Sequence, residues 1–324
     1  MLFPVLVFTL SCFFSYLVLW LLLYLFGNLF LDIPNSRSSH TSAIPRGGGL
    51  IFVLFSSISS LLYLFINSWS LSLIFPTSAV AILLLPLSLV GLLDDRFNLS
   101  TRVRFFAQFI TVLLLLYFSP VFDLSIPLYY IIILLIAGIA FINFSNFMDG
   151  LDGLLSGCMF VILATSCIRL QLSWPIWILL GSLLGFLFLN WSPAKVFMGD
   201  VGSTFLGGIF LALLSHASNW TDAFFMLLVA SPLFLDSSIC VIRRLFAGHH
   251  IFTPHRLHLY QRLKQSGWSH STVSSLYISA TFVLSLLGFI GGVPVLFVSV
   301  LILSAIGVLL DKFIAVPFNS VSAS

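Results

Sequence analysis

The sequence contains no glutamate, and all ten of its acidic residues are aspartates. Charge of either sign is scarce: charged residues make up 7% of the 324 positions, hydrophobic residues make up 60%, and the mean hydropathy is +1.17. This composition excludes a soluble domain. The missing glutamate also argues against an EF-hand calcium loop, because the last ligand of that loop is a glutamate.

Several short motifs are absent as well. The chain has no CxxC pair, no HExxH metal motif and no GxxxxGK[ST] phosphate loop. We interpret the four cysteines as packing residues in or beside hydrophobic runs: Cys12, Cys158, Cys167 and Cys240.

Long hydrophobic runs are what the sequence has in abundance. A run of about 18 or more apolar residues can cross a bilayer as a helix, which satisfies its own backbone hydrogen bonds. The runs predict an all-α polytopic integral membrane protein with about eleven (10–11) transmembrane helices in a single domain over residues 1–324. The first run lacks the basic start and cleavage site of a signal peptide, so we expect it to be retained. The predicted helices are residues 3–30, 48–66, 71–92, 104–119, 128–145, 153–170, 175–190, 204–218, 222–241, 272–290 and 295–315.

Basic residues gather in alternate loops. Residues 31–47, 93–103, 146–152, 191–203 and 242–271 hold or border every lysine and arginine except Arg169 and Lys312. The positive-inside rule therefore predicts that these loops are cytoplasmic, with the N-terminus outside and the C-terminus inside. The +3 net charge reflects this bias and needs no nucleic-acid partner.

Eight of the aspartates fall on the predicted cytoplasmic side, whereas Asp123 and Asp222 fall on the other. Carboxylates at membrane depth are costly and mark functional sites. The one-sided cluster therefore indicates a cation or phosphate site that faces the cytoplasm.

The stretch GLLDDRFNLSTRVRF ends a hydrophobic run with Asp94 and Asp95. Two adjacent carboxylates do not both ionise cheaply, so a bound Mg²⁺ or a shared proton is one interpretation. The alternative is a helix end whose aspartates form salt bridges with Arg96 and Arg102.

The stretch NFSNFMDGLDGLLSG holds Asn146, Asp149 and Asp152. In a helix these three side chains would share one face. The glycines beside the aspartates would let a ligand approach the backbone. The alternative is that the aspartates are N-caps of the helix that follows.

The stretch WSPAKVFMGDVGSTFLGG holds Lys195, Phe197 and Asp200, and its GDVGST segment opens a helix. We expect backbone N–H groups at this helix start to be free for an anion or a phosphate.

The last long polar loop contains His255, Arg256 and His258 in the stretch TPHRLHLYQ. Arginine suits bidentate contacts with phosphate, so a phosphate-binding loop is one interpretation. A loop attracted to anionic lipid is the alternative. The HRLH spacing also suits a metal, but no cysteine lies nearby in the sequence.

These blocks resemble the polyprenyl-phosphate N-acetylhexosamine-1-phosphate transferases, of glycosyltransferase family 4. The matching stretches are DIPNSRSSHTSAIPRGGG, GLLDDRFNLSTRVRFFAQ, NFSNFMDGLDGL, VFMGDVGSTFLG and RRLFAGHHIFTPHRLHLYQRL. The family includes bacterial enzymes that start O-antigen and teichoic acid synthesis, and phospho-N-acetylmuramoyl-pentapeptide transferase is a relative. Its fold of ten or eleven helices agrees with the count above.

The resemblance implies an activity and a set of partners. The acceptor would be undecaprenyl phosphate in the lipid bilayer, the donor a UDP-N-acetylaminosugar and the cofactor Mg²⁺, for which Mn²⁺ could substitute. The single domain would be catalytic, in the bacterial inner membrane, with a homodimer as one assembly. The competing hypothesis is an ion transporter, which predicts acids in mid-helix and internal repeats; the sequence has neither.

The resemblance also implies residue roles. Asp200 and Asp95 would hold the metal, and Asp94 would deprotonate or orient the lipid phosphate. The substrate-binding residues would be Asn146, Asp149, Asp152, Lys195, Phe197 (stacked on uracil), His255, Arg256 and His258.

The last block departs from that of the N-acetylglucosamine-transferring members. They typically carry Asp-Arg-x-His-x-His-His, whereas here His255 replaces the aspartate, and Tyr260 and Gln261 replace the later histidines. The HRxHxYQ form is similar to the subgroup that starts O-antigen or outer-core chains, in some cases with a 6-deoxy sugar such as N-acetylfucosamine or N-acetylquinovosamine.

Overall fold

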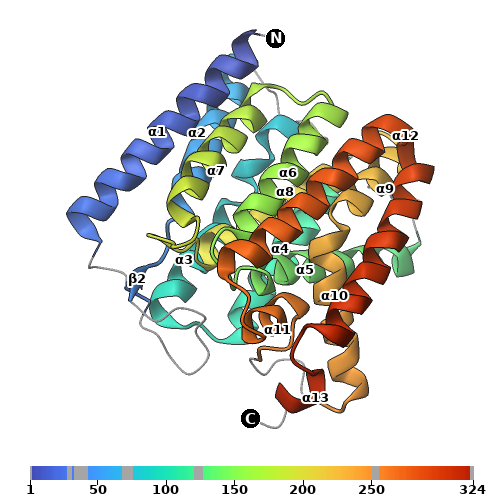
Figure 1. Ribbon diagram of the computed structural model, residues 1–324. Coiled ribbons are helices and arrows are strands. Elements are labelled where there is room, and N and C mark those ends of the chain that lie inside the picture. The colour runs from blue at the N-terminus through green and yellow to red at the C-terminus, as the bar shows by residue number, and fades with distance from the viewer. Residues whose placement is uncertain are drawn as a thin grey trace.

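A computed structural model describes residues 2–27, 31–32, 43–67, 76–119, 127–249 and 255–321. This part of the chain is almost entirely helical (Figure 1). The predictions for Asp123 and for the breaks at Ser68 and Pro120 lie outside it. The elements are α1 (Leu2–Phe26), β1 (Leu31–Asp32), β2 (Ile44–Pro45), α2 (Leu50–Ile66), the 3₁₀ helix η1 (Thr77–Ile82), α3 (Leu85–Phe97), α4 (Thr101–Tyr117), α5 (Leu128–Phe147), α6 (Leu154–Arg169), α7 (Trp174–Asn190), α8 (Asp200–Ser215), α9 (Trp220–Val229), α10 (Ser231–Phe246), α11 (Leu259–Gln265), α12 (His270–Phe313) and α13 (Phe318–Val321).

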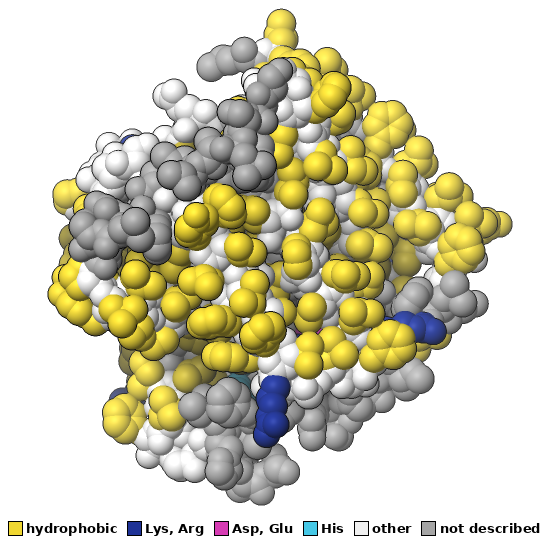
Figure 2. Space-filling model, turned by 180° about the vertical axis from the view of Figure 1, so that it is seen from behind, with side chains coloured by type: hydrophobic (Ala, Val, Ile, Leu, Met, Phe, Trp, Pro, Cys, Tyr) yellow, Lys and Arg dark blue, Asp and Glu magenta, His cyan; other side chains and the backbone are white. Residues whose placement is uncertain are grey.

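The prediction of an all-α polytopic membrane protein is confirmed. Among the described residues, α1, the η1–α3 segment, α5 and α12 are long and apolar enough to cross a membrane, and shorter apolar helices lie between them. Large hydrophobic side chains on α1, α5 and α12 are exposed. Figure 2 shows hydrophobic side chains over most of the rear face, with prominent Lys and Arg side chains along its lower edge. The exposed apolar surface is therefore the surface that lipid covers.

Three of the predicted helices take a different form. The single helix predicted over 222–241 is two helices, α9 and α10, which meet at an angle of 75°. Pro232 stands in the first turn of α10 and has no N–H to continue the hydrogen bonds of α9. The last two predicted helices are the limbs of α12, which turns back at Gly292 (φ 67°) beside Pro294 (Figure 1).

Two of the helix ends that differ from the prediction bear on the site. α3 runs on to Phe97, so Asp94 and Asp95 lie in its last turn. Asn98, in the left-handed conformation, ends it. α8 begins at Asp200 rather than at 204, so the GDVGST motif is already its first turn.

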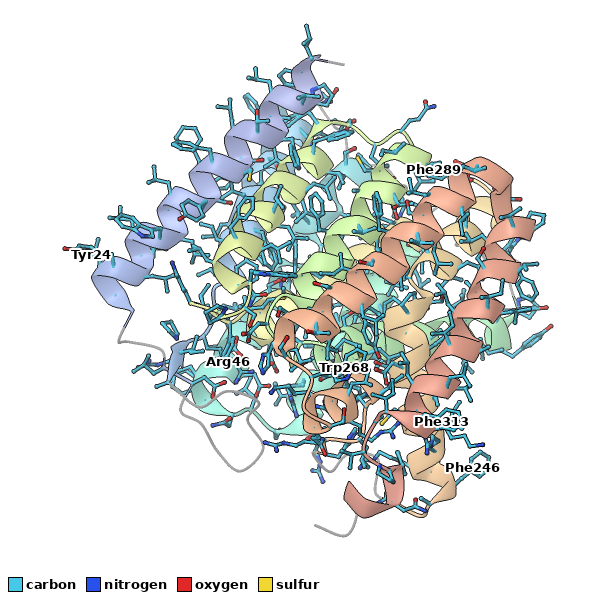
Figure 3. All side chains as sticks on the ribbon, in the orientation of Figure 1. Tyr24, Arg46, Phe246, Trp268, Phe289 and Phe313 are labelled. Carbon is cyan, nitrogen blue, oxygen red and sulfur yellow. The ribbon has the colours of Figure 1, made fainter. Side chains whose placement is uncertain are left out.

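Helix α8 forms the centre of the bundle. Every residue of α8 except Leu214 is buried. α3 and α5 pack against it directly. The last turn of α3, the α5–α6 turn and the start of α8 hold Asp94, Asp95, Asp149, Asp152 and Asp200, and they meet at one end of the bundle, near Arg46 in Figure 3. The core therefore fixes the start of α8 beside the other aspartates.

Candidate active site

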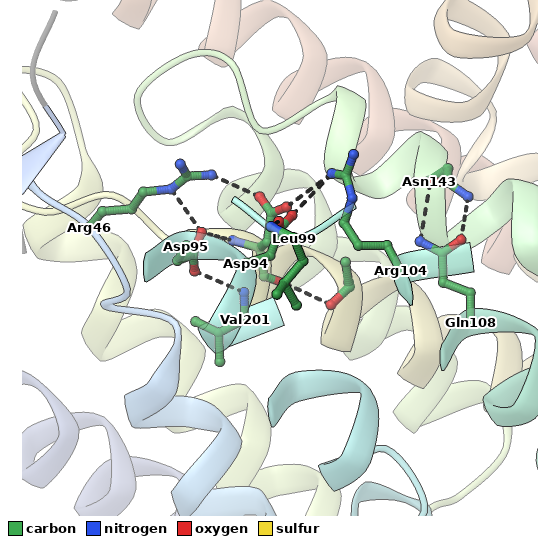
Figure 4. Close-up of polar contacts among 10 residues, drawn as sticks. Arg46, Asp94, Asp95, Leu99, Arg104, Gln108, Asn143 and Val201 are labelled. Atoms are coloured by element: carbon green, nitrogen blue, oxygen red, sulfur yellow. Dashed lines mark hydrogen bonds and ion pairs between the residues drawn. The ribbon is translucent and has the colours of Figure 1, made fainter. Parts of the chain in front are cut away.

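Three aspartates and two arginines form a cluster at this end of the bundle (Figure 4). Arg46 pairs with Asp95 (Nε to Oδ1, 2.9 Å) and with Asp200 (Nη2 to Oδ1, 2.8 Å). Arg104 pairs with Asp94 (Nη1 to Oδ2, 3.1 Å) and lies 3.8 Å from Oδ2 of Asp200. The three aspartates lie together, and Arg46 and Arg104 are the arginines that pair with them; their roles stay predictions. One negative charge remains in excess.

Asp95 caps the N-terminus of α8. Its Oδ1 accepts the N–H of Asp200 (2.9 Å) and its Oδ2 accepts the N–H of Val201 (3.2 Å). The next two N–H groups of α8, those of Gly202 and Ser203, donate to the carbonyl of Gly199. The prediction that N–H groups are free for a phosphate at this helix start is therefore wrong, because a carboxylate of the protein already takes that place.

Three glycines allow this close assembly. A Cβ on Gly199, whose φ is 77°, would lie 2.4 Å from Oδ2 of Asp95. A Cβ on Gly91 would lie 2.6 Å from the backbone oxygen of Asp200. A Cβ on Gly49 would lie 2.6 Å from the Cα of Gly202 in α8. The close approach of α2, α3 and α8 therefore depends on missing side chains.

Arg46 reaches the cluster because backbone hydrogen bonds tie its segment to the loop before α8. Phe197 donates its N–H to the carbonyl of Pro45 (2.8 Å), and Gly48 donates to the carbonyl of Phe197 (2.9 Å). This pairing also fixes the backbone of Phe197. Lys195, by contrast, points to the exposed side of the same loop.

Asp149 and Asp152 lie in the turn between α5 and α6, not on one helical face. Burial raises the pKa of Asp149 well above its ordinary value, and the charges of Asp200, Asp95 and Asp152 add to this rise against the opposing charge of Arg46. Asp149 therefore belongs electrostatically to the cluster. Neither aspartate caps α6, whose N-cap is Gly153.

Asp152 braces three segments. Its Oδ2 accepts the N–H of Ala194 (3.2 Å), and its Oδ1 lies 3.1 Å from Nδ1 of His270. Burial alone would raise the pKa of Asp152, but the hydrogen bond and the charge of His270 outweigh it and lower that pKa. Ser274 donates to the backbone oxygen of Asp152 (2.7 Å). The carboxylate therefore ties the turn to the α7–α8 loop and to α12.

Asn190 extends this frame. Its Oδ1 accepts from Gly153 N (3.1 Å) and from Ser156 Oγ (2.7 Å), and its Nδ2 donates to the carbonyl of Val196 (3.0 Å). A buried amide with three partners at the end of α7 thus holds the α5–α6 turn against the loop that carries Phe197.

Buried Asp236 orders the segment that holds His255, Arg256 and His258. Its carboxylate accepts the N–H groups of Leu259 (2.8 Å) and Tyr260 (3.1 Å) and the hydroxyl of Tyr277 (2.7 Å). Nδ1 of His258 lies 3.7 Å from its Oδ1. Tyr260 then donates its hydroxyl to the carbonyl of Phe147, just behind Asn146. Residues 255–258 are thereby docked against the α5–α6 turn.

We expect Asp236→Asn to raise the substrate KM roughly tenfold, because a hydrogen-bonded charge contributes about 1.5–3 kcal/mol and the amide of asparagine has one accepting oxygen where the carboxylate has two. Tyr277→Phe removes one of the same bonds and should have a smaller effect. Steady-state kinetics and a melting curve of each purified variant measure this. A lower melting temperature with an unchanged KM would restrict Asp236 to a stabilising role.

Several residues of this site were not identified from the sequence: Arg46, Arg104, Asn190, Asp236 and His270. Arg46 was counted only as a loop charge, although its position before three consecutive glycines is a usable indication of a tight approach. The partners of Asp236 are residues 259, 260 and 277. They are 23 to 41 positions away in the sequence, so a local sequence pattern does not predict these contacts.

The aspartate cluster has donor groups that suit a hard cation. Carboxylate oxygens are the ligands that Mg²⁺ prefers, and Mg²⁺ commonly takes one or two of them together with substrate phosphates. The carboxylate of Asp200 contacts Arg46 (2.8 Å) and Arg104 (3.8 Å) and accepts no backbone N–H from the described residues, whereas both oxygens of Asp95 accept backbone N–H groups. Asp200 is therefore the better placed metal ligand of the two.

Fold and site together define a polytopic membrane protein with an aspartate–arginine site where its helices end. The profile of "Glycosyl transferase family 4" matches residues 77–218, which include Asp94, Asp149 and Asp200. The chain is 29% identical over 286 residues, 80% of this chain and 75% of the relative, to a probable undecaprenyl-phosphate N-acetylglucosaminyl 1-phosphate transferase of Bacillus subtilis.

Shorter regions match two further relatives. A decaprenyl-phosphate N-acetylglucosaminephosphotransferase of Mycobacterium leprae is 40% identical over 112 residues, 30% of this chain and 28% of that protein. A phospho-N-acetylmuramoyl-pentapeptide-transferase of Kosmotoga olearia is 36% identical over 117 residues, 35% of this chain and 36% of that protein. Residues 77–218 belong to glycosyl transferase family 4, and the comparisons support an enzyme of that family. The resemblance is confirmed at this level, and the O-antigen subgroup stays a prediction.

Proposed function

We propose that this enzyme transfers an N-acetylaminosugar 1-phosphate from a UDP-sugar to undecaprenyl phosphate, at the cytoplasmic face of the bacterial inner membrane. The observation that carries the proposal is the aspartate–arginine cluster beside lipid-facing helices, in a chain similar to transferases with polyprenyl-phosphate acceptors. The basic loops at this end of the bundle support the cytoplasmic orientation.

In the proposed reaction, an oxygen of the lipid phosphate attacks the phosphorus that carries the sugar. The bond from that phosphorus to the oxygen bridging to the nucleotide breaks, and UMP leaves. A phosphate nucleophile needs little activation, which favours direct attack over a covalent enzyme intermediate.

The cluster supplies distinct groups for this reaction. Asp94 is held by the N–H of Leu99 (2.6 Å) and by Arg104, which fixes the carboxylate that would orient or deprotonate the lipid phosphate. Asp200, with Asp95 behind it, would hold Mg²⁺, which neutralises charge on the donor diphosphate. Arg46 and Arg104 add positive charge next to the same oxygens.

Residues around the cluster would bind the donor. Asn146, Asp149 and Asp152 would line the nucleotide pocket, Phe197 would stack on uracil, and Arg256 and His258 would bind the phosphates, with Lys195 and His255 at the margin. The HRxHxYQ sequence supports a role at the start of O-antigen or outer-core chains. The donor would be UDP-N-acetylglucosamine or a 6-deoxy sugar nucleotide such as UDP-N-acetylfucosamine or UDP-N-acetylquinovosamine.

A donor panel tests the proposal. The purified protein is mixed with undecaprenyl phosphate, Mg²⁺ or Mn²⁺, and each radiolabelled UDP-N-acetylhexosamine or 6-deoxy analogue. We expect a labelled lipid and release of UMP with at least one donor, and no product with EDTA. If no donor gives UMP, the proposal is refuted. Full activity in EDTA would refute the proposed dependence on a divalent metal.

A further inference from the structure

Cys240, His255 and His258 meet where α10 passes residues 255–258. One ligand atom from each lies within 4.8 Å of the other two. The HRLH stretch lacks a cysteine nearby in the sequence, but the fold brings Cys240 to it from α10. We propose that these three side chains form a binding site for a soft divalent cation such as Zn²⁺, separate from the aspartate cluster.

The donor set suits this chemistry. One thiolate and two imidazoles are ligands that Zn²⁺ takes, and three protein ligands leave a fourth position for water or a phosphate oxygen. With bonds of about 2.0–2.3 Å, tetrahedral ligand atoms lie roughly 3.5 Å apart, so these atoms need to close by about 1 Å. Binding converts the thiol of Cys240 to a thiolate and releases its proton.

His258 has a carboxylate beside its ring. Its Nδ1 is buried and lies 3.7 Å from Oδ1 of Asp236. A carboxylate behind a histidine fixes the ring and leaves the other nitrogen for the metal. Asp236 thus stands where a metal-bound histidine usually has its supporting carboxylate.

His255 is the least buried of the three proposed ligands. Its Nδ1 accepts the N–H of Leu257 over a long 3.3 Å. The half-buried ring also offers the ion a path from solvent, since Cys240 and His258 are buried.

Occupancy would have a consequence for the proposed reaction. An ion here draws His255 and His258 toward Cys240 and away from the donor phosphates. We therefore expect Zn²⁺ to inhibit transfer at concentrations far below those of Mg²⁺. This consequence rests on the proposed function, whereas binding of the ion does not.

Cobalt titration of the metal-stripped full-length protein tests the site without an activity assay. We expect one equivalent of Co²⁺ to give a thiolate-to-cobalt charge-transfer band in the wild type, and excess Mg²⁺ to leave it unchanged. Cys167→Ser, a matched change at a buried cysteine outside the cluster, should keep the band, and Cys240→Ser should lose it. No band in the wild type, or a band that persists in Cys240→Ser, overturns the proposal.

A second variant covers the case in which Cys240→Ser does not fold. His255→Ala changes a half-buried side chain and should weaken Co²⁺ binding at least about tenfold. Unchanged affinity in this variant also overturns the proposal. Because these readouts are spectroscopic, they stand even if no sugar donor is found.

Discussion

Asp200→Asn should lower the turnover number by about 100-fold or more while the protein remains folded. The substitution keeps the size of the side chain but removes the charge that pairs with Arg46 at 2.8 Å and lies 3.8 Å from Arg104. Loss of one preorganised electrostatic group in an active site costs about this much. Asp94→Asn should lose a similar factor, because it removes the carboxylate that Arg104 and Leu99 hold in place.

Asp222→Asn is the matched control. Asp222 also pairs with an arginine, Arg169, at 2.7 Å, but this pair lies at the far end of α6 from the site. Ion pairs near the surface contribute about 1 kcal/mol or less, so turnover should stay within about twofold of the wild type. Initial rates of UMP release at saturating substrate measure all three variants. An active Asp200→Asn enzyme would break the assignment of the metal to Asp200.

Gly91→Ala should lower activity by about 100-fold through packing alone. The new Cβ would lie 2.6 Å from the backbone oxygen of Asp200, so α3 and α8 must move apart. Overpacking of this kind costs about 1–3 kcal/mol of stability, and a shift of about 1 Å in reacting groups costs about two orders of magnitude in rate. The substitution removes no charged group, so its effect would report the spacing of Asp94 and Asp95 from Asp200.

Gly307→Ala is the corresponding control, because nothing lies within 4 Å of its Cβ position in α12. Replacing a helical glycine that has room should leave stability unchanged or raise it by about 0.4–1 kcal/mol. Turnover and thermal midpoint of both alanine variants are measured side by side. Equal activity of Gly91→Ala and Gly307→Ala would show that the α3–α8 contact tolerates displacement.

Much of the fold was predictable because hydrophobic runs indicate the helices and polar breaks indicate the loops between them. The break between α9 and α10 was not predicted, although Ser231-Pro232 marks it within the run. The start of α8 was placed four residues too late, because glycines favour a loop in the sequence. In the structure Gly202 is a helical residue that lets the backbone of Gly49 approach α8.

The sequence predicted the acidic residues of the candidate site but not the residues that pair with them. Asp94, Asp95 and Asp200 stand out because carboxylates are rare in so hydrophobic a chain. The contacts of Arg46 with residues 95 and 200 join distant parts of the sequence, and local pattern does not reveal which arginine pairs with which aspartate. The role of Asp95 as a helix cap is likewise a property of the packed bundle.

The cap on α8 also bears on how the enzyme is made. Asp95 emerges from the ribosome more than a hundred residues before the N–H groups of Asp200 and Val201 that it accepts. Until α8 enters the membrane, the carboxylate of Asp95 lacks those two donors, and α8 lacks its cap. The acidic cluster is therefore completed only when the central helix docks, because the donors to Asp95 and the carboxylate of Asp200 arrive together on α8.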